Sequence, residues 1–113
     1  MELRKRQAEF AAKLGLLLVY ASTLPDQRVR VSWAYRDTAS NQRVGGHPRS
    51  LHVSRLAIDL VLDEWNDEEQ EWVWQRTTEP YELLGRFWES IGGSWGGRFG
   101  DGGHFSLTYG GMK

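Results

Sequence analysis

The chain has 113 residues, with 14 basic and 15 acidic side chains, 13 glycines and no cysteine. This length is typical of one domain with a single core, so we expect one monomeric domain over residues 1–113. A formal net charge of −1 argues against a protein that binds nucleic acid by neutralising many phosphates. The lack of cysteine excludes disulfides and cysteine-ligated zinc, so any metal site must use histidines and carboxylates.

The N-terminal segment has the apolar spacing of an amphipathic helix. Phe10, Leu14 and Leu17 recur at helical intervals, which predicts a helix over about residues 3 to 22 that covers a sheet. The longest apolar run, residues 16 to 21, is far shorter than the roughly 20 residues of a membrane span. We therefore expect neither membrane insertion nor a cleaved signal peptide.

Two segments alternate with the period of a β-strand. Residues 29 to 35 predict a half-buried strand that delivers Arg36 at its end. Residues 56 to 63 predict a second strand, in which Asp59 lies on the face opposite the larger apolar side chains. Between them, residues 37 to 49 are rich in turn-forming residues and predict a loop.

The rest of the chain completes a mixed pattern of strands and helices. It adds a solvated acidic turn at residues 63 to 71 and a short return strand at 72 to 74. A second helix at 79 to 91 and a glycine-rich segment at 92 to 103 follow. Residues 104 to 109 predict a last strand with His104 opposite its apolar face. Together the elements predict an α+β fold, a small antiparallel sheet with helices packed on it.

Three histidines, His47, His52 and His104, are available for chemistry. His52 precedes Asp59 by seven residues, and His104 follows Asp101 by three. Two imidazoles and one carboxylate are the ligand set of a catalytic zinc site that keeps one position open, and His52, Asp59 and His104 could supply it. Neither spacing is specific alone, so a surface histidine and a paired carboxylate remain the alternative. For His47 we expect a solvated loop histidine.

Two strings carry a resemblance to a known family: Ser50-x-His52-x6-Asp59 and Trp95-Gly96-Gly97-Arg98-Phe99-x-Asp101-x2-His104-Phe105. They resemble the zinc peptidases of the D-alanyl-D-alanine carboxypeptidase and L-alanyl-D-glutamate endopeptidase group. That group includes many bacteriophage endolysins and shares a fold with the hedgehog signalling domain. The resemblance covers about residues 31 to 109 and implies that fold here.

The resemblance also implies a zinc centre and its base. By position, His52, Asp59 and His104 correspond to the three ligands of Zn²⁺. Asp101 corresponds to the acidic residue that acts as general base. These roles predict that Asp101→Asn keeps zinc and loses turnover.

Supporting roles follow for residues around that centre. Arg36 corresponds to an arginine that polarises the substrate carbonyl, and Ser50 to a serine that supports the first histidine. Trp95 stands where the family lines its cleft, with core packing as an equal alternative. The sequence departs from the family at Arg55, where a glycine is usual three residues after the first histidine.

The implied function is zinc-dependent hydrolysis of an amide bond in the peptidoglycan peptide, between L-alanine and D-glutamate, by a phage or prophage endolysin. Such an enzyme would be made in the host cytoplasm and would reach the cell wall after release by a separate factor. One alternative is a D-alanyl-D-alanine carboxypeptidase or dipeptidase. Another is a non-catalytic, virion-associated binding module that keeps the zinc fold.

Overall fold

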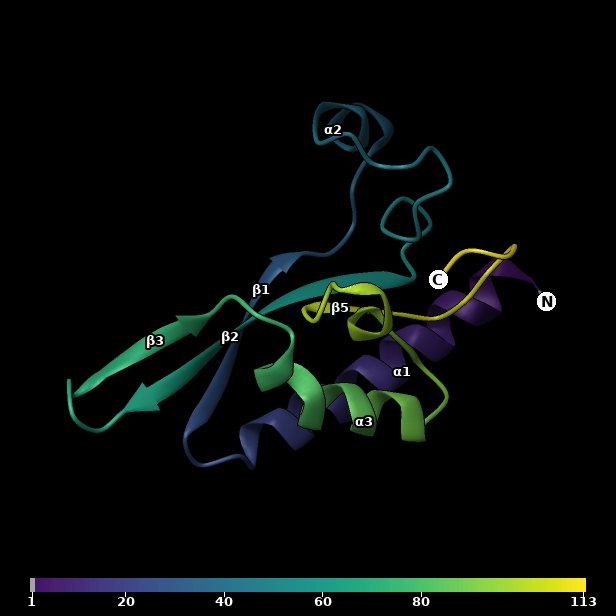
Figure 1. The fold of residues 1–113 in the computed structure, drawn as a ribbon. Helices are drawn as coiled ribbons and strands as arrows, with labels where there is room; N and C mark the ends of the chain where they lie inside the picture. The colour runs from purple at the N-terminus through teal and green to yellow at the C-terminus, as the bar shows by residue number, and fades with distance from the viewer. Residues whose placement is uncertain (1) are drawn as a thin grey trace.

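A five-stranded antiparallel sheet forms the centre of the computed structural model, which describes residues 2–113. Its strands are β1 (Gln27–Trp33), β2 (Ala57–Asn66), β3 (Glu71–Gln75), β4 (Ser94–Trp95) and β5 (His104–Ser106). The order across the sheet is β1-β2-β5-β4, and β3 pairs with the second half of β2. The long strand β2 is therefore shared by the body of the sheet and by a projecting hairpin with β3 (Figure 1).

The helices α1 (Leu3–Ser22) and α3 (Glu82–Ser90) lie beside each other on one side of the sheet (Figure 1). A single 3-10 turn, η1 (Glu79–Tyr81), leads into α3. Leu17, Trp88 and Phe105 bring α1, α3 and β5 together in one fully buried core. This arrangement confirms the predicted α+β fold, with helices packed on a small antiparallel sheet.

The predicted N-terminal helix is confirmed with the expected bounds, and its apolar stripe buries Phe10, Leu17 and Ala21. These side chains recur along one face because successive helical turns place them there. None of the helices formed by residues 2–113 has the length and apolar character that a bilayer crossing requires.

The strand β1 differs from its prediction in position and in burial. It covers Gln27–Trp33 rather than 29 to 35, and Val31 is 60 % exposed. The pairing with β2 becomes irregular between Val31 and Trp33, after which the chain leaves the sheet. Arg36 therefore follows the strand across a short coil, and β1 is an edge strand with one long side in solvent.

The predicted solvated turn at residues 63 to 71 is wrong for its first residues. Strand β2 continues to Asn66, so Asp63 lies within the sheet and is only 3 % exposed. Arg28 and Arg30 on β1 donate hydrogen bonds to its carboxylate at 3.1 and 2.9 Å. The return strand β3 is confirmed.

Two segments predicted as loops contain short elements. The helix α2 (Thr38–Arg43) begins where the Asp37 carboxylate accepts a hydrogen bond from the Ser40 amide at 2.7 Å. The glycine-rich segment contains β4 and a 3-10 helix, η2 (Gly96–Phe99). The last strand is shorter than predicted: it ends at Ser106, opposite Ala57, and one further hydrogen bond joins the Leu107 amide to Leu56 O at 3.0 Å.

Candidate metal centre

His52, Asp59 and His104 converge at one end of β2, as the sequence predicted. Asp59 on β2 and His104 on β5 are direct partners across the two strands, so their side chains stand on the same face. His52 comes from the turn before β2 and is 2 % exposed. One ligand atom from each of the three lies within 4.8 Å of the others.

A contact with the backbone determines which nitrogen of the His52 ring carries a proton. Its Nδ1 lies 2.8 Å from the carbonyl oxygen of Ala34, and a carbonyl only accepts, so Nδ1 must donate. In the neutral ring Nε2 then carries a lone pair and no proton, and this atom lies 3.2 Å from Asp59 Oδ2. Two acceptors at this distance repel each other unless a proton or a metal ion lies between them. The donor set therefore fits a cation.

His104 completes the set from the other side of the carboxylate. Its Nδ1 lies 3.1 Å from Asp59 Oδ1, and its buried Nε2 has no hydrogen-bond partner among residues 2–113. Ligand atoms bound to tetrahedral zinc at about 2.0 Å are separated by roughly 3.3 Å, close to the 3.2 and 3.1 Å between the imidazole nitrogens of His52 and His104 and the Asp59 oxygens.

The electrostatics favour an ionised carboxylate at Asp59. Burial by itself would raise its pKa, but hydrogen bonds and charge interactions with His104 and His52 outweigh burial and hold the pKa of Asp59 well below its usual range. The site therefore offers one negative charge and two imidazole nitrogens, which are ligands that Zn²⁺ binds.

Asp101 lies on the loop that leads into β5 and shares a cleft of about 310 Å³ with Asp59. Partial burial, and then the negative charge of Asp59, raise the pKa of Asp101. The loop closes tightly because the Asp101 amide donates to Gly96 O at 2.9 Å, and a Cβ on Gly96 would overlap the Asp101 carbonyl oxygen. Gly100 at φ +83° turns the chain between them.

Trp95 belongs to the core rather than to the lining of this cleft. It is 4 % exposed, and its Nε1 donates to the Gly102 carbonyl at 2.8 Å. Its indole therefore braces the loop that carries Asp101 and His104. The core-packing alternative for this residue is the one the structure shows.

Arg36 and Ser50 lie beside the first histidine. The Arg36 amide donates to His52 O at 3.2 Å, and Ser50 Oγ accepts from the His52 amide at 3.2 Å. Arg36 Nη2 is 3.4 Å from Ser50 Oγ, and its buried Nε has no partner within residues 2–113. Ser50 thus supports the His52 turn, while the guanidinium is directed at Ser50.

Arg55 adopts the backbone conformation that a glycine would adopt without strain. Its φ of +61° is in the left-handed region, and its guanidinium lies 4.0 Å from the ring centroid of Tyr35. The departure from the family therefore preserves the turn between His52 and β2. His47 is exposed in a turn, where its Nδ1 accepts from the Arg49 amide at 2.9 Å.

Sequence reasoning missed three side chains that line the cleft. Trp74 lies in β3, Arg76 directly follows it, and Tyr81 lies in η1. The Tyr81 hydroxyl accepts from the Leu62 amide at 2.9 Å and donates to Gln75 O at 3.0 Å. The available signal was weak, because the predicted return strand ended at Trp74 and Arg76 lay two residues beyond it.

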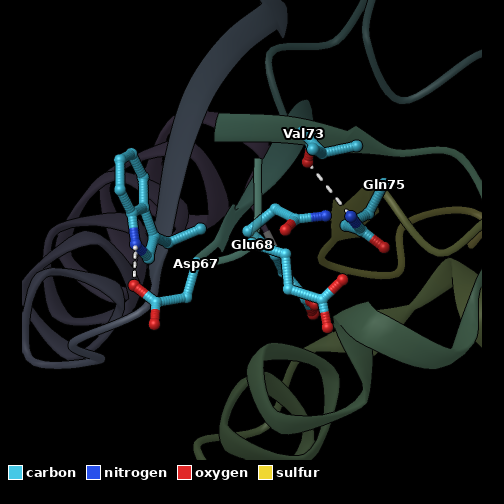
Figure 2. Close-up of a pocket in the computed structure, with 7 residues that line it drawn as sticks. Asp67, Glu68, Val73 and Gln75 are labelled. Carbon is cyan, nitrogen blue, oxygen red and sulfur yellow. Dashed lines mark hydrogen bonds between the residues drawn. The ribbon is translucent and has the colours of Figure 1, made fainter. Parts of the chain in front are cut away.

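A larger hollow, of about 500 Å³, is lined by residues of the β2–β3 hairpin and has no histidine among the described residues of its lining (Figure 2). Acidic side chains such as Glu68 line it, and hydrogen bonds from Trp65 to Asp67 and from Gln75 to Val73 fix its walls. Neither Asp59 nor Asp101 lines it, whereas both line the smaller cleft, which therefore borders the histidine–carboxylate cluster.

The comparisons with known proteins agree with this geometry. No curated protein matches the chain. The family model described as D-alanyl-D-alanine carboxypeptidase matches residues 44–107, more than half of the chain, and this range includes His52, Asp59, Asp101 and His104. The chain therefore belongs to the D-alanyl-D-alanine carboxypeptidase family of zinc peptidases.

Proposed function

We propose that this chain is a zinc-dependent peptidoglycan peptidase that hydrolyses the bond between L-alanine and D-glutamate in the wall peptide, as a phage or prophage endolysin. One observation carries the proposal. The Asp59 carboxylate lies between two imidazoles at 3.1 and 3.2 Å, and Asp101 lines the same cleft. A ligand set and a nearby carboxylate are what metal-assisted amide hydrolysis needs.

His52, Asp59 and His104 would hold the zinc ion. A zinc ion bound there would act as a Lewis acid that activates water and polarises an amide carbonyl. Asp101 then accepts a proton on its carboxylate and returns it to the leaving amine. Its position on a tightly closed loop keeps the carboxylate near the centre while the backbone between Gly96 and His104 is fixed.

Arg36 would stabilise the negative charge that develops on the substrate carbonyl oxygen. In support, its Nε is buried without a partner among residues 2–113, and its Nη2 makes one long contact with Ser50 at 3.4 Å. Donor capacity therefore remains for a substrate. A rotation of the guanidinium away from Ser50 would be needed, since Arg36 is not among the residues that line the cleft.

The second candidate is cleavage of the terminal D-alanyl-D-alanine bond. The observation that favours it is the description of the matching family, which names this carboxypeptidase activity. Both reactions use the same metal and base, so they differ in where the peptide is held and not in the chemistry.

The place of action is part of the proposal and depends on the endolysin role. Such an enzyme is made in the host bacterial cytoplasm and acts on the cell wall after its release. Its substrate is the peptidoglycan peptide.

Digestion of purified peptidoglycan, with and without a chelator, tests the proposed function. Mass spectrometry of the products separates the candidates, because only the endopeptidase releases peptide that has lost its L-alanine link, and only the carboxypeptidase removes terminal D-alanine. Asp101→Asn, loaded with zinc, is the matched control. Absence of cleavage in the chelator-free digest would contradict both candidates.

A further inference from the structure

The cleft beside the candidate metal centre is lined in part by the C-terminal end of β3 and the residues that follow it. Trp74 and Arg76 line this cleft together with Asp59 and Asp101. Arg76 is the cation among the described residues that line the cleft. The lining of the cleft therefore contains two carboxylates and one guanidinium.

Arg76 is held in place by its neighbour and not by an acid. Its guanidinium carbon lies 3.9 Å from the ring centroid of Trp74, and within residues 2–113 no carboxylate is within ion-pair distance of it. The other arginines on this face, Arg28 and Arg30, are both paired with Asp63. The charge of Arg76 is thus available to a ligand.

A carboxylate is the ligand group that this arrangement fits. The planar guanidinium donates two parallel hydrogen bonds to a carboxylate, and an aromatic face beneath it keeps the fork in one orientation. An anionic peptide that enters the cleft is repelled by Asp101 unless a cation lies on its path. Arg76 supplies that cation in the lining of the same cleft.

We propose that Arg76, stacked on Trp74, binds a free carboxylate of the peptide substrate and so selects acidic wall peptides over their amidated forms. The inference rests on the proposed function, because it takes the wall peptide as the substrate. Two groups of that peptide have the required chemistry: the α-carboxylate of D-glutamate, next to the bond that the endopeptidase cuts, and the carboxylate at the end of the stem.

Binding to the zinc-loaded Asp101→Asn protein tests the inference without turnover. Isothermal titration would compare three synthetic stem peptides: one with both carboxylates free, one amidated at D-glutamate and one amidated at its C-terminus. We expect amidation of one of the two carboxylates to weaken binding about 10-fold or more, as loss of a charge-assisted hydrogen bond does. The position that matters identifies the carboxylate that Arg76 holds.

Substitution of Arg76 links the preference to this residue. In the same background, Arg76→Gln should bind the acidic and amidated peptides equally, and Arg76→Lys should keep part of the preference. Arg86→Gln is the matched control, because it removes one exposed arginine charge on α3 outside the cleft, where Arg86 pairs with Glu82 at 2.7 Å. It should keep the full preference.

Three results would overturn the inference: equal affinity for all three peptides, an unchanged preference in Arg76→Gln, or no binding of any peptide. The peptidoglycan digest distinguishes these failures from failure of the proposed function. A protein that cleaves wall peptides with no carboxylate preference refutes the role of Arg76 alone. A protein that shows the preference but cleaves nothing refutes the peptidase and leaves the binding role standing.

Discussion

Asp59 and Asp63 lie on the same face of β2, four residues apart, yet their surroundings give them different roles. Asp63 is bound by Arg28 and Arg30, which carry permanent positive charges. Asp59 is bound by two histidines, whose imidazoles carry a charge only when they are protonated. The charge of Asp63 is therefore balanced within the chain, whereas that of Asp59 calls for an added cation.

This difference separates structural from functional carboxylates better than burial does. Asp63 is the more deeply buried of the two, since 4 % of its side chain is exposed against 28 % for Asp59. A paired carboxylate in a sheet fixes strand register. A carboxylate between two imidazole nitrogens belongs to a donor set that could hold a metal ion.

Removal of the Asp59 charge should produce the largest effect. We expect Asp59→Asn to lower zinc affinity by more than about 100-fold, because loss of a group that only orients a ligand already costs about 10- to 100-fold. Zinc should raise the melting temperature of the wild-type protein and of Asp63→Asn, and not that of Asp59→Asn. Scanning calorimetry measures these melting temperatures. Equal stabilisation of Asp59→Asn and Asp63→Asn by zinc would contradict the different roles of the two carboxylates.

Asp101→Asn should reduce kcat by about 100- to 10,000-fold, the usual contribution of a general base, and should leave bound zinc unchanged. The reason is that Asp101 lines the cleft but is outside the ligand cluster. Rates on wall peptide and metal content by atomic emission, measured on the same sample, check both parts. Loss of zinc in this variant would make Asp101 a ligand instead.

Asp63→Asn should lower the free energy of unfolding by about 1 to 2 kcal/mol, because the buried side chain becomes a weaker acceptor of the hydrogen bonds from Arg28 and Arg30. The loss stays small because both arginines are half-exposed and can be solvated by water. Urea denaturation of the zinc-free protein measures this loss. Zinc content should stay at the wild-type level, which is the opposite pattern to Asp59→Asn.

The same ion pair predicts a pH dependence of stability. Hydrogen bonds from Arg30 hold the pKa of Asp63 below its ordinary value of 3.8, against the opposing effect of burial, and Arg28 adds to the lowering. A depressed folded-state pKa contributes stability that is present above 3.8 and is lost as pH falls toward the folded value. The stability difference between wild type and Asp63→Asn should therefore shrink on acidification below about pH 4. A constant difference down to pH 2 would contradict the ion pair.

Arg55 offers the smallest expected effect. Arg55→Gly relieves a left-handed backbone cost of about 1 kcal/mol and loses a stacking contact with Tyr35 of similar size, so stability should change by less than about 1 kcal/mol. Arg55→Ala loses the contact and keeps the strain. It should be less stable than Arg55→Gly by about 1 kcal/mol in urea denaturation.

The sequence predicted which faces Asp59 and His104 occupy because alternation along a strand decides the face of a side chain, whereas their role as metal ligands came from the resemblance to the zinc peptidases. Asp59 and His104 fall on the less apolar faces of their strands, and antiparallel pairing then brings them opposite each other. The pairing of Asp63 with Arg28 and Arg30 could not be predicted in this way. It depends on the register of β1 against β2, which alternation leaves open.

Other features depended on contacts between segments distant in the chain. Trp95 is buried because α3 has Gly85 where its indole packs, and a Cβ there would overlap the ring. Nothing in the local sequence distinguishes that core position from a place in the cleft. The direction of the Arg36 side chain likewise depends on Ser50, which the short helix α2 separates from it.

The central claim is that one zinc ion binds at His52, Asp59 and His104, and zinc stoichiometry tests it most directly. Wild-type protein and His104→Ala would be purified in parallel, dialysed against zinc and then against buffer, and assayed for metal by atomic emission. The account predicts one zinc per wild-type chain and none in His104→Ala, with both proteins folded by circular dichroism. Folded His104→Ala that retains one zinc per chain would contradict it.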